Sequence, residues 1–144
     1  MDSLTKRVDL PARLLMSVLF LLSGIGKLSA VGPTQHYMEA FGVPGVLLWP
    51  AAAFEISSGI LLVIGLWNRP LSILLSGWCL LTAAIFHTAF SDQVQQVMFL
   101  KNLVMAGGFL LLAKHGAHDY ALDAVRSRRR ATASSRVLSA RSDA

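Results

Sequence analysis

The sequence has a single cysteine, Cys79, and few charged residues between its two ends. One cysteine excludes an internal disulfide and a dithiol redox centre, so Cys79 is expected to be a small buried hydrophobic residue. The sequence also lacks a glycine-rich phosphate loop, a nucleophile elbow and a dinucleotide-binding fingerprint. No motif therefore supports nucleotide binding or hydrolase activity. Internal repeats and the alternating pattern of β-strands do not occur. What remains is a chain of long apolar segments.

Apolar residues make up 54% of the 144 residues and charged residues only 15%, which is typical of a membrane protein. The apolar residues form blocks of nearly bilayer length, and about 20 such residues cross the roughly 30 Å of hydrocarbon. We therefore predict an all-α, integral membrane four-helix bundle. It consists of an N-terminal segment (1–9), a membrane domain (10–124) with spans at about 10–31, 46–66, 70–90 and 94–113, and a C-terminal tail (125–144).

A short helix is expected between the first and second spans. Gly32 and Pro33 disfavour continuation of the first helix, and Thr34 is positioned to cap a new helix that runs to Phe41. This segment is too short to span, so we predict an interfacial helix with its aromatic side chains at headgroup level.

The basic residues indicate an orientation. Lys6, Arg7 and Arg13 precede or enter the first span, Arg69 lies in the middle connection, and further basic residues follow the fourth span. The other two connections contain none. Because the number of spans is even and both tails are basic, both termini are expected in the cytoplasm of a multi-pass inner (plasma) membrane protein.

A cleaved signal peptide is the alternative interpretation of the N-terminal segment. Lys6, Arg7 and Arg13 would form its basic region, and Ser29-Ala30 would form its cleavage site. The apolar run is long for a signal peptide, however, and Lys27 interrupts it before the cleavage site. Its loss would leave three spans and would place the basic tail on the wrong side of the membrane.

The tail at residues 125–144 is basic, rich in serine and alanine, and poor in apolar residues. Arg128-Arg129-Arg130 lies close to a membrane span, where anionic lipids attract basic residues by about 1 kcal/mol each. We therefore expect a disordered or surface-bound tail whose partners are anionic lipids of the bilayer, and no nucleic-acid partner.

Ionisable side chains lie inside the apolar segments, where a charge at the bilayer centre costs roughly 2.5–3.5 kcal/mol. Glu55 is about nine residues into the second span, roughly 13 Å below its outer boundary at a rise of 1.5 Å per residue. Lys101, beside Asn102, enters the fourth span at a similar depth. Lys27 and His87 lie near the outer ends of the first and third spans. The sequence therefore predicts one polar layer in the outer half of the bundle.

Small residues lie beside these groups at helical spacing. Glu55 shares its side of the helix with Ala51, Ala52, Ser58 and Gly59. Because small residues let membrane helices approach closely, we expect the layer to face other helices rather than lipid.

Two interpretations of the layer stay open. In the structural one, Glu55 forms a buried ion pair with Lys101 or Lys27, and the removal of one partner costs about 3–5 kcal/mol. In the functional one, the layer binds a quinone-like head group or handles protons. There Glu55 would share a proton, His87 would hydrogen-bond a head-group carbonyl and Lys101 would keep Glu55 charged, with Lys27 and Asn102 in support.

Haem and metal sites have weaker support. Haem ligation would need a second axial ligand, and His36, in a connecting segment, is the only outer-side partner for His87. His115 and His118, with Asp119 nearby, provide too few ligands for a metal and fit solvated residues next to the membrane better.

Several short motifs follow one another between residues 10 and 124. They are Gly24-x-Gly26-Lys27, Gly42-Val43-Pro44, Glu55-x-x-x-Gly59 with Gly65 and Arg69, His87, Lys101-Asn102 with Gly107-Gly108, Gly116, and Tyr120-Ala121-Leu122-Asp123. In this order and spacing they resemble the DoxX family of small four-helix membrane proteins. The resemblance implies an inner-membrane bundle, in a family whose named members include subunits of quinone-linked sulfur oxidoreductases.

The hypothesis from the sequence is a DoxX-type subunit of a quinone-linked membrane oxidoreductase, with quinone as its cofactor. Partner redox subunits or a second copy of the chain are the expected protein partners. Glu55, His87 and Lys101 are the expected catalytic residues, and Lys27 and Asn102 are expected to bind the cofactor. One alternative is a non-catalytic scaffold or assembly subunit whose ion pair only locks helix packing. A small transporter is less favoured, because no span is broken at mid-membrane.

Overall fold

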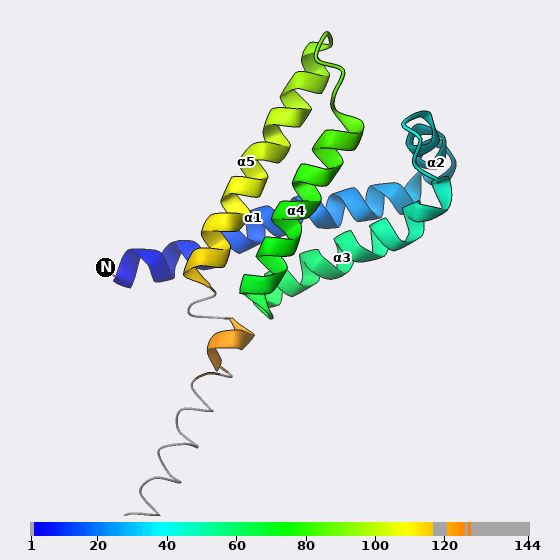
Figure 1. Cartoon of the computed structure of the whole chain (residues 1–144). Helices are drawn as coiled ribbons and strands as arrows, with labels where there is room; N and C mark the ends of the chain where they lie inside the picture. Colours follow the sequence, from blue (N-terminus) through cyan, green and yellow to red (C-terminus); the bar gives the residue numbers. More distant parts are fainter. Residues whose placement is uncertain (1, 117–120, 126, 128–144) are drawn as a thin grey trace, which may run out of the picture.

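The computed structural model describes residues 2–116, 121–125 and 127, with residues 2–7 described as backbone only. All of its regular structure in these ranges is helical (Figure 1). The elements are α1 (Asp2–Ser29), α2 (Val31–Ala40), the 3₁₀ turn η1 (Gly45–Leu47), α3 (Leu48–Ile64), α4 (Asn68–Phe86) and α5 (Gln93–His115).

Four segments are long and apolar enough to cross a membrane, which confirms the prediction of a four-span, all-helical protein. Their ends differ from the predicted spans by a few residues. The largest difference is at the end of the third span, which stops at Phe86 rather than at residue 90, and helix α1 extends beyond its span to Asp2. The predicted tail lies outside the described residues, apart from Val125 and Ser127. The four segments are Val8–Ser29, Gly45–Ile64, Asn68–Phe86 and Gln93–His115.

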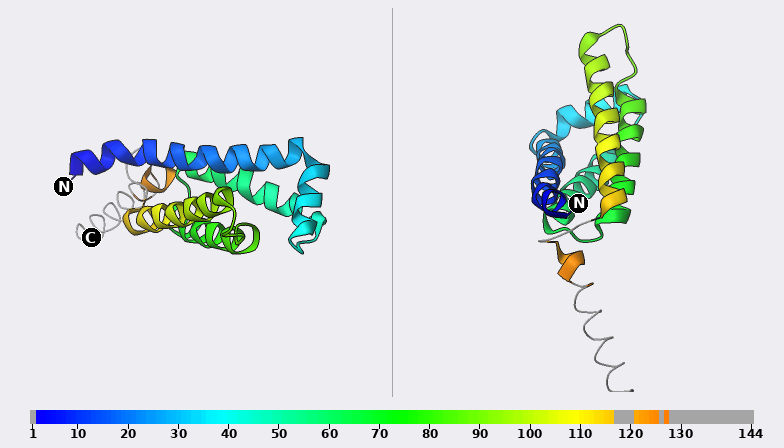
Figure 2. Two further views of the ribbon diagram at one scale, coloured as in Figure 1. Left: turned by 90° about the horizontal axis from the view of Figure 1, so that it is seen from above. Right: turned by 90° about the vertical axis from the view of Figure 1, so that its left-hand side faces the viewer.

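The spanning helices form two antiparallel pairs, α1 with α3 and α4 with α5. The pairs lie against each other and cross at a clear angle, as Figures 1 and 2 show. α2 lies across the end of the molecule where α1 ends and α3 begins. The α4–α5 connection lies toward the same end, which we call the α2 end. The opposite end holds the α3–α4 connection and is called the turn end.

Aromatic and aliphatic side chains join the two pairs near their crossing. The rings of Phe20 on α1 and Phe109 on α5 meet edge to face with 5.5 Å between centroids. Leu62 and Leu75 are fully buried beside them. Within the second pair, Ser76 Oγ donates a hydrogen bond of 3.1 Å to the Ala106 carbonyl, which satisfies a hydroxyl in the apolar interior.

α2 begins earlier than the sequence predicted, at Val31 rather than after Thr34. Thr34 therefore does not cap the helix, which corrects our expectation, and its Oγ1 donates a 2.7 Å hydrogen bond to the Ala30 carbonyl. Pro33 is tolerated because it lies in the first helical turn, where a backbone N–H has no partner within the helix.

The turn end is held together by a buried arginine that the sequence pattern had marked only as an orientation signal. Arg13 is 0% exposed. Its Nε donates to Asp9 Oδ2 at 3.1 Å, and its Nη1 donates to the carbonyls of Leu62 and Val63 at 3.2 Å. These carbonyls lie in the last turn of α3, at the negative end of its dipole, where the usual donors four residues on are no longer helical. The Leu62 carbonyl also accepts from the Gly65 N–H at 3.2 Å.

The segment after α5 returns to the same place. The Asn68 backbone N–H donates to Asp123 Oδ2 at 2.9 Å, which caps the start of α4, and the Asp123 N–H donates to the Gly65 carbonyl at 3.2 Å. Gly65 ends α3 with a positive φ of 68°. Residues far apart in the sequence therefore close the turn end around one glycine.

Replacement of Gly65 by alanine is expected to lower the free energy of unfolding by about 1–3 kcal/mol. A Cβ atom would lie 2.5 Å from both Ala121 Cβ and Arg13 Nη1, on a backbone with a φ that β-carbons disfavour. Thermal unfolding of the purified protein in detergent measures the loss. Gly77→Ala is the matched control, because no atom lies within 4 Å of its added Cβ and alanine favours a helix. An equal loss in both variants would contradict the argument.

Candidate functional site

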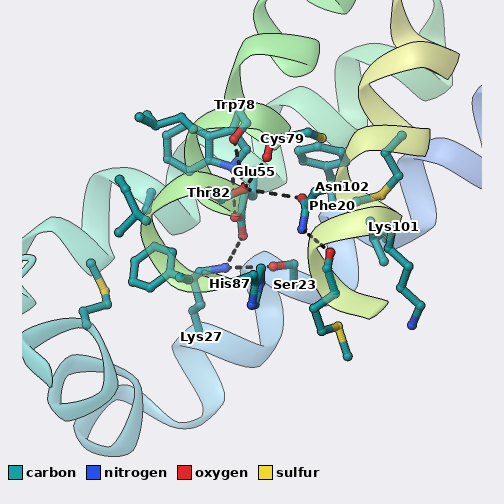
Figure 3. A pocket seen from close by; sticks show the side chains of 18 of the residues that line it. Phe20, Ser23, Lys27, Glu55, Trp78, Cys79, Thr82, His87, Lys101 and Asn102 are labelled. Carbon is teal, nitrogen blue, oxygen red and sulfur yellow. Dashed lines mark hydrogen bonds and ion pairs between the residues drawn. The ribbon is translucent and has the colours of Figure 1, made fainter. Parts of the chain in front are cut away.

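A pocket of about 1120 Å³ lies at the α2 end, lined from both helix pairs, α2 and the start of the α4–α5 connection (Figure 3). Most of its lining is apolar, with aromatic and methionine side chains among the aliphatic ones. The polar and ionisable side chains that line it are Ser23, Lys27, Thr34, Tyr37, Glu55, Trp78, Thr82, His87, Lys101 and Asn102. The pocket therefore brings together all five residues that the sequence singled out: Lys27, Glu55, His87, Lys101 and Asn102.

Glu55 and Lys27 form an ion pair on the pocket wall. Lys27 Nζ lies 2.6 Å from Glu55 Oε2, and the two side chains are 24% and 6% exposed. The same ammonium donates a 2.7 Å hydrogen bond to Ser23 Oγ, one turn back on α1. The pair joins α1 to α3 and compensates the charge of a carboxylate that is almost completely buried.

The second oxygen of Glu55 also has a partner. Trp78 Nε1 on α4 donates a 3.3 Å hydrogen bond to Glu55 Oε1. The Trp78 ring packs against Phe54, one residue before Glu55, with 4.7 Å between centroids. Glu55 is therefore the point at which the two helix pairs are linked by hydrogen bonds inside the pocket.

Lys101 is not the partner of Glu55, which corrects one of the two pairings the sequence allowed. Its side chain is exposed and makes no ion pair or hydrogen bond within the described part of the chain. Figure 3 shows its ammonium pointing away from Glu55. Lys101 and Glu55 have similar depths, but depth leaves open the direction in which a side chain leaves its helix.

Asn102 lies next to Lys101 and faces the neighbouring helix. Its Nδ2 donates to the Met98 carbonyl at 3.0 Å, and its Oδ1 accepts a long 3.4 Å hydrogen bond from Thr82 Oγ1 on α4. The single hydroxyl hydrogen of Thr82 is shared with the Trp78 and Cys79 carbonyls of its own helix, which are closer acceptors at 2.9 and 3.1 Å. Asn102 therefore supports the contact between α4 and α5 on the pocket wall.

His87 immediately follows α4 and is held by a residue of α5. Its Nδ1 lies 2.8 Å from Gln95 Oε1. Partial burial raises the pKa of Tyr37, on α2, above its usual value, and the side chain of Gln95 beside the phenol opposes that rise. Gln95 thus lies between His87 and α2 at the edge of the pocket.

Aromatic rings reinforce this connection. Tyr37 stacks on Phe86 with 5.7 Å between centroids, and Phe41 meets Phe86 edge to face at 5.5 Å. These contacts fasten α2 to the end of α4, so that α2 covers one side of the pocket.

The positions of the possible metal ligands can be compared with the sequence expectation only in the described residues. Within the described ranges, no three His, Cys, Asp or Glu side chains lie close enough together to hold a metal ion. His118 and Asp119, which belong to the juxtamembrane alternative, lie outside those ranges. Cys79 is buried and lines the pocket, in agreement with a small hydrophobic role.

Trp78, which lines the pocket, and Gln95, which holds the pocket residue His87, are the residues that the sequence reasoning missed. Trp78 carried a usable signal, because it lies in the middle of a span, whereas tryptophan prefers the membrane interface and its N–H needs a partner when buried. Gln95 carried none, since it lies at the start of α5 among other glutamines.

The comparisons with known proteins agree with this architecture. The DoxX family model matches residues 8–88, which include most of α1, the whole of α2 to α4, and His87. The chain belongs to the DoxX family. This DoxX protein is 43% identical over 114 residues to "Inner membrane protein YqjF" of Escherichia coli K12, covering 79% of this chain and 88% of the relative. It is 34% identical over 119 residues to "Inner membrane protein YphA" of the same organism, covering 78% and 85%. No solved structure matches the chain.

Replacement of Lys27 by methionine is expected to destabilise this DoxX protein by up to about 3 kcal/mol, because it leaves the Glu55 carboxylate buried without its cation. The loss should lie at or below the lower end of the range of about 3–5 kcal/mol for breaking a buried ion pair, since part of the Lys27 side chain is exposed. Chemical denaturation in detergent measures it.

Two further variants test the assignment of the pair. Lys101→Met should unfold like the wild type, because Lys101 has no partner in the described chain. Combining Lys27→Met with Glu55→Leu should recover part of the lost stability, because no unpaired charge remains. If Lys101→Met is as damaging as Lys27→Met, the ion pair has been assigned to the wrong lysine.

Proposed function

We propose that this protein binds a lipid-soluble, quinone-like molecule in the pocket at the α2 end, as a subunit of a quinone-linked oxidoreductase system of the inner membrane. One observation carries the proposal: a large, mainly apolar pocket lies between membrane-spanning helices, and a cluster of ionisable groups lies on its wall. Pockets of this kind hold ligands that have an apolar body and a small number of polar atoms.

The polar groups supply both donors and acceptors for a head group. Lys27 uses two of its three N–H groups, on Ser23 and Glu55, so one N–H is available to a carbonyl oxygen. The Lys101 ammonium has all three available within the described chain. His87 has one ring nitrogen engaged by Gln95 and one without a partner in the same residues. Because these groups still have hydrogen-bonding capacity, the ionisable side chains of the membrane helices are candidates for ligand binding.

Our proposal gives Glu55 a different role from the one expected from the sequence. Both of its oxygens accept hydrogen bonds, from Lys27 and Trp78. In our proposal Glu55 therefore holds the Lys27 ammonium in place rather than meeting the ligand as a free base. Lys27, His87 and Lys101 contact the head group, and Asn102 shapes the wall.

The relatives' names support the inner membrane as the location. The distribution of basic residues supports cytoplasmic termini, because Arg13, Arg69 and Lys114 belong to the turn end whereas the connections of the α2 end contain no lysine or arginine. In this orientation the pocket lies in the outer half of the membrane.

Cysteine labelling tests the orientation in a Cys79→Ser background. Ser91→Cys, in the exposed α4–α5 connection, should react with a membrane-impermeant maleimide added to intact spheroplasts. Ser127→Cys, at the other end of the molecule, should react only after lysis. The reverse pattern would contradict cytoplasmic termini.

Filling the pocket tests the binding proposal. Ala51 lines the pocket, so Ala51→Phe is expected to weaken binding of a short-tailed benzoquinone by about tenfold or more. Ala53 lies two residues along the same helix with an exposed side chain, so Ala53→Phe should bind like the wild type. Isothermal titration calorimetry of the purified protein gives both affinities. If neither the wild type nor Ala53→Phe binds saturably, the quinone proposal is wrong.

A non-catalytic scaffold or assembly subunit is the second candidate. The observation that favours it is that both oxygens of Glu55 already have partners within the protein. A role in linking α1, α3 and α4 is therefore enough to explain the cluster. This candidate predicts that quinones do not bind and that Lys27→Met acts on stability alone.

A further inference from the structure

Gln95 is hydrogen-bonded to the histidine of the pocket and lies beside the helix that covers it. Its side-chain oxygen lies 2.8 Å from His87 Nδ1, and its side chain opposes the rise in the pKa of the nearby Tyr37 phenol. Gln95 is half-buried and belongs to the first turn of α5, whereas His87 follows α4 and Tyr37 lies on α2. Side chains from three elements therefore lie together here, and the hydrogen bond between Gln95 and His87 joins two of them.

This arrangement decides which ring nitrogen of His87 carries the proton. An amide oxygen can only accept, so the neutral ring must carry its proton on Nδ1 to bond to Gln95 Oε1. The tautomer of a histidine is set by the hydrogen bond made at one nitrogen, and here that bond leaves Nε2 with a lone pair. Nε2 has no partner in the described part of the chain, and His87 lines the pocket.

The two lysines of the pocket have the opposite requirement from that of Nε2. Lys27 and Lys101 offer N–H groups that require an acceptor, such as a carbonyl or hydroxyl oxygen. A neutral His87 Nε2 instead requires a donor. A quinone has only acceptor oxygens and leaves Nε2 unpaired, whereas a hydroquinone has hydroxyl groups that donate to Nε2 and can still accept from a lysine.

We infer that Gln95 is a positioning residue that presents His87 Nε2 as a hydrogen-bond acceptor, so that the pocket prefers the reduced, hydroxyl-bearing form of its ligand. This inference rests on the proposed function, because it names the form of the quinone-like molecule that the same pocket selects. A polar group left without a partner in a water-poor site is costly, which makes one such hydrogen bond a source of discrimination.

The first measurement needs no ligand. Protein labelled with ¹⁵N-histidine in detergent is expected to show His87 with a protonated Nδ1 and an unprotonated Nε2 at a pH where the ring is neutral. Comparison with His87→Asn assigns the signals. Gln95→Leu should lose this preference, and Gln95→Glu should keep it, because a carboxylate oxygen also accepts from Nδ1. Gln93→Leu is the control, since Gln93 is exposed on the same helix and has no hydrogen bond from its side chain within the described residues.

The second measurement compares the two redox forms of one ligand. Calorimetry under anaerobic conditions should show a short-tailed benzohydroquinone binding the wild type about tenfold more tightly than the matching benzoquinone. The ratio should fall to near one in Gln95→Leu and should persist in Gln95→Glu and Gln93→Leu. Thermal unfolding of each variant shows that the ratio is compared between folded proteins.

The outcomes separate the inference from the proposed function. If both forms bind but His87 carries its proton on Nε2, or the two affinities are equal, the inference is wrong and the proposed function stands. If neither form binds, both are wrong, whichever tautomer is seen. A loss of the preference in Gln93→Leu as large as that in Gln95→Leu would also overturn the inference, because the effect would not belong to Gln95.

Discussion

The Lys27 ammonium and the Glu55 carboxylate lie 2.6 Å apart between α1 and α3, inside two segments that are apolar enough to cross a membrane. This contact requires the two helices to approach closely, and two glycines allow the approach. A Cβ on Gly24 would lie 2.6 Å from Ile56 Cγ1, and one on Gly59 would lie 2.7 Å from Leu21 Cγ. The small residues let α1 and α3 approach, and the approach lets the two charges pair. Neither the Lys27 ammonium nor the Glu55 carboxylate is readily buried without the other.

The pocket is a consequence of how the two helix pairs meet. Phe20 and Phe109 hold the pairs together near their crossing, and the polar cluster around Glu55 links them again at the α2 end through Trp78. Between these contacts the wall is apolar, and α2 covers one side because its aromatic rings pack on Phe86. A pocket with this wall, inside a membrane protein of the DoxX family, suits a molecule that is itself soluble in lipid.

The sequence predicted that Lys27, Glu55 and His87 lie in one layer, because a rise of about 1.5 Å per residue converts sequence position into height along a helix. Height alone did not predict which of the charged side chains form an ion pair. Lys101 has nearly the same height as Glu55, yet its side chain leaves α5 in another direction, and the partner of Glu55 is Lys27. Arg13 shows the same limit, since a residue that signals orientation in the sequence is fully buried against the carbonyls that end α3.

The sequence by itself determined the class of protein, the number of its spans and their approximate extent, because hydropathy over about 20 residues is a local property of the chain. The order of its short motifs also determined the family. Only the tertiary structure decided which charges pair, which tryptophan satisfies Glu55 and which glutamine holds His87. Those contacts depend on the rotation of each helix about its axis and on the angle at which the two pairs cross. Both are set by packing between segments far apart in the sequence.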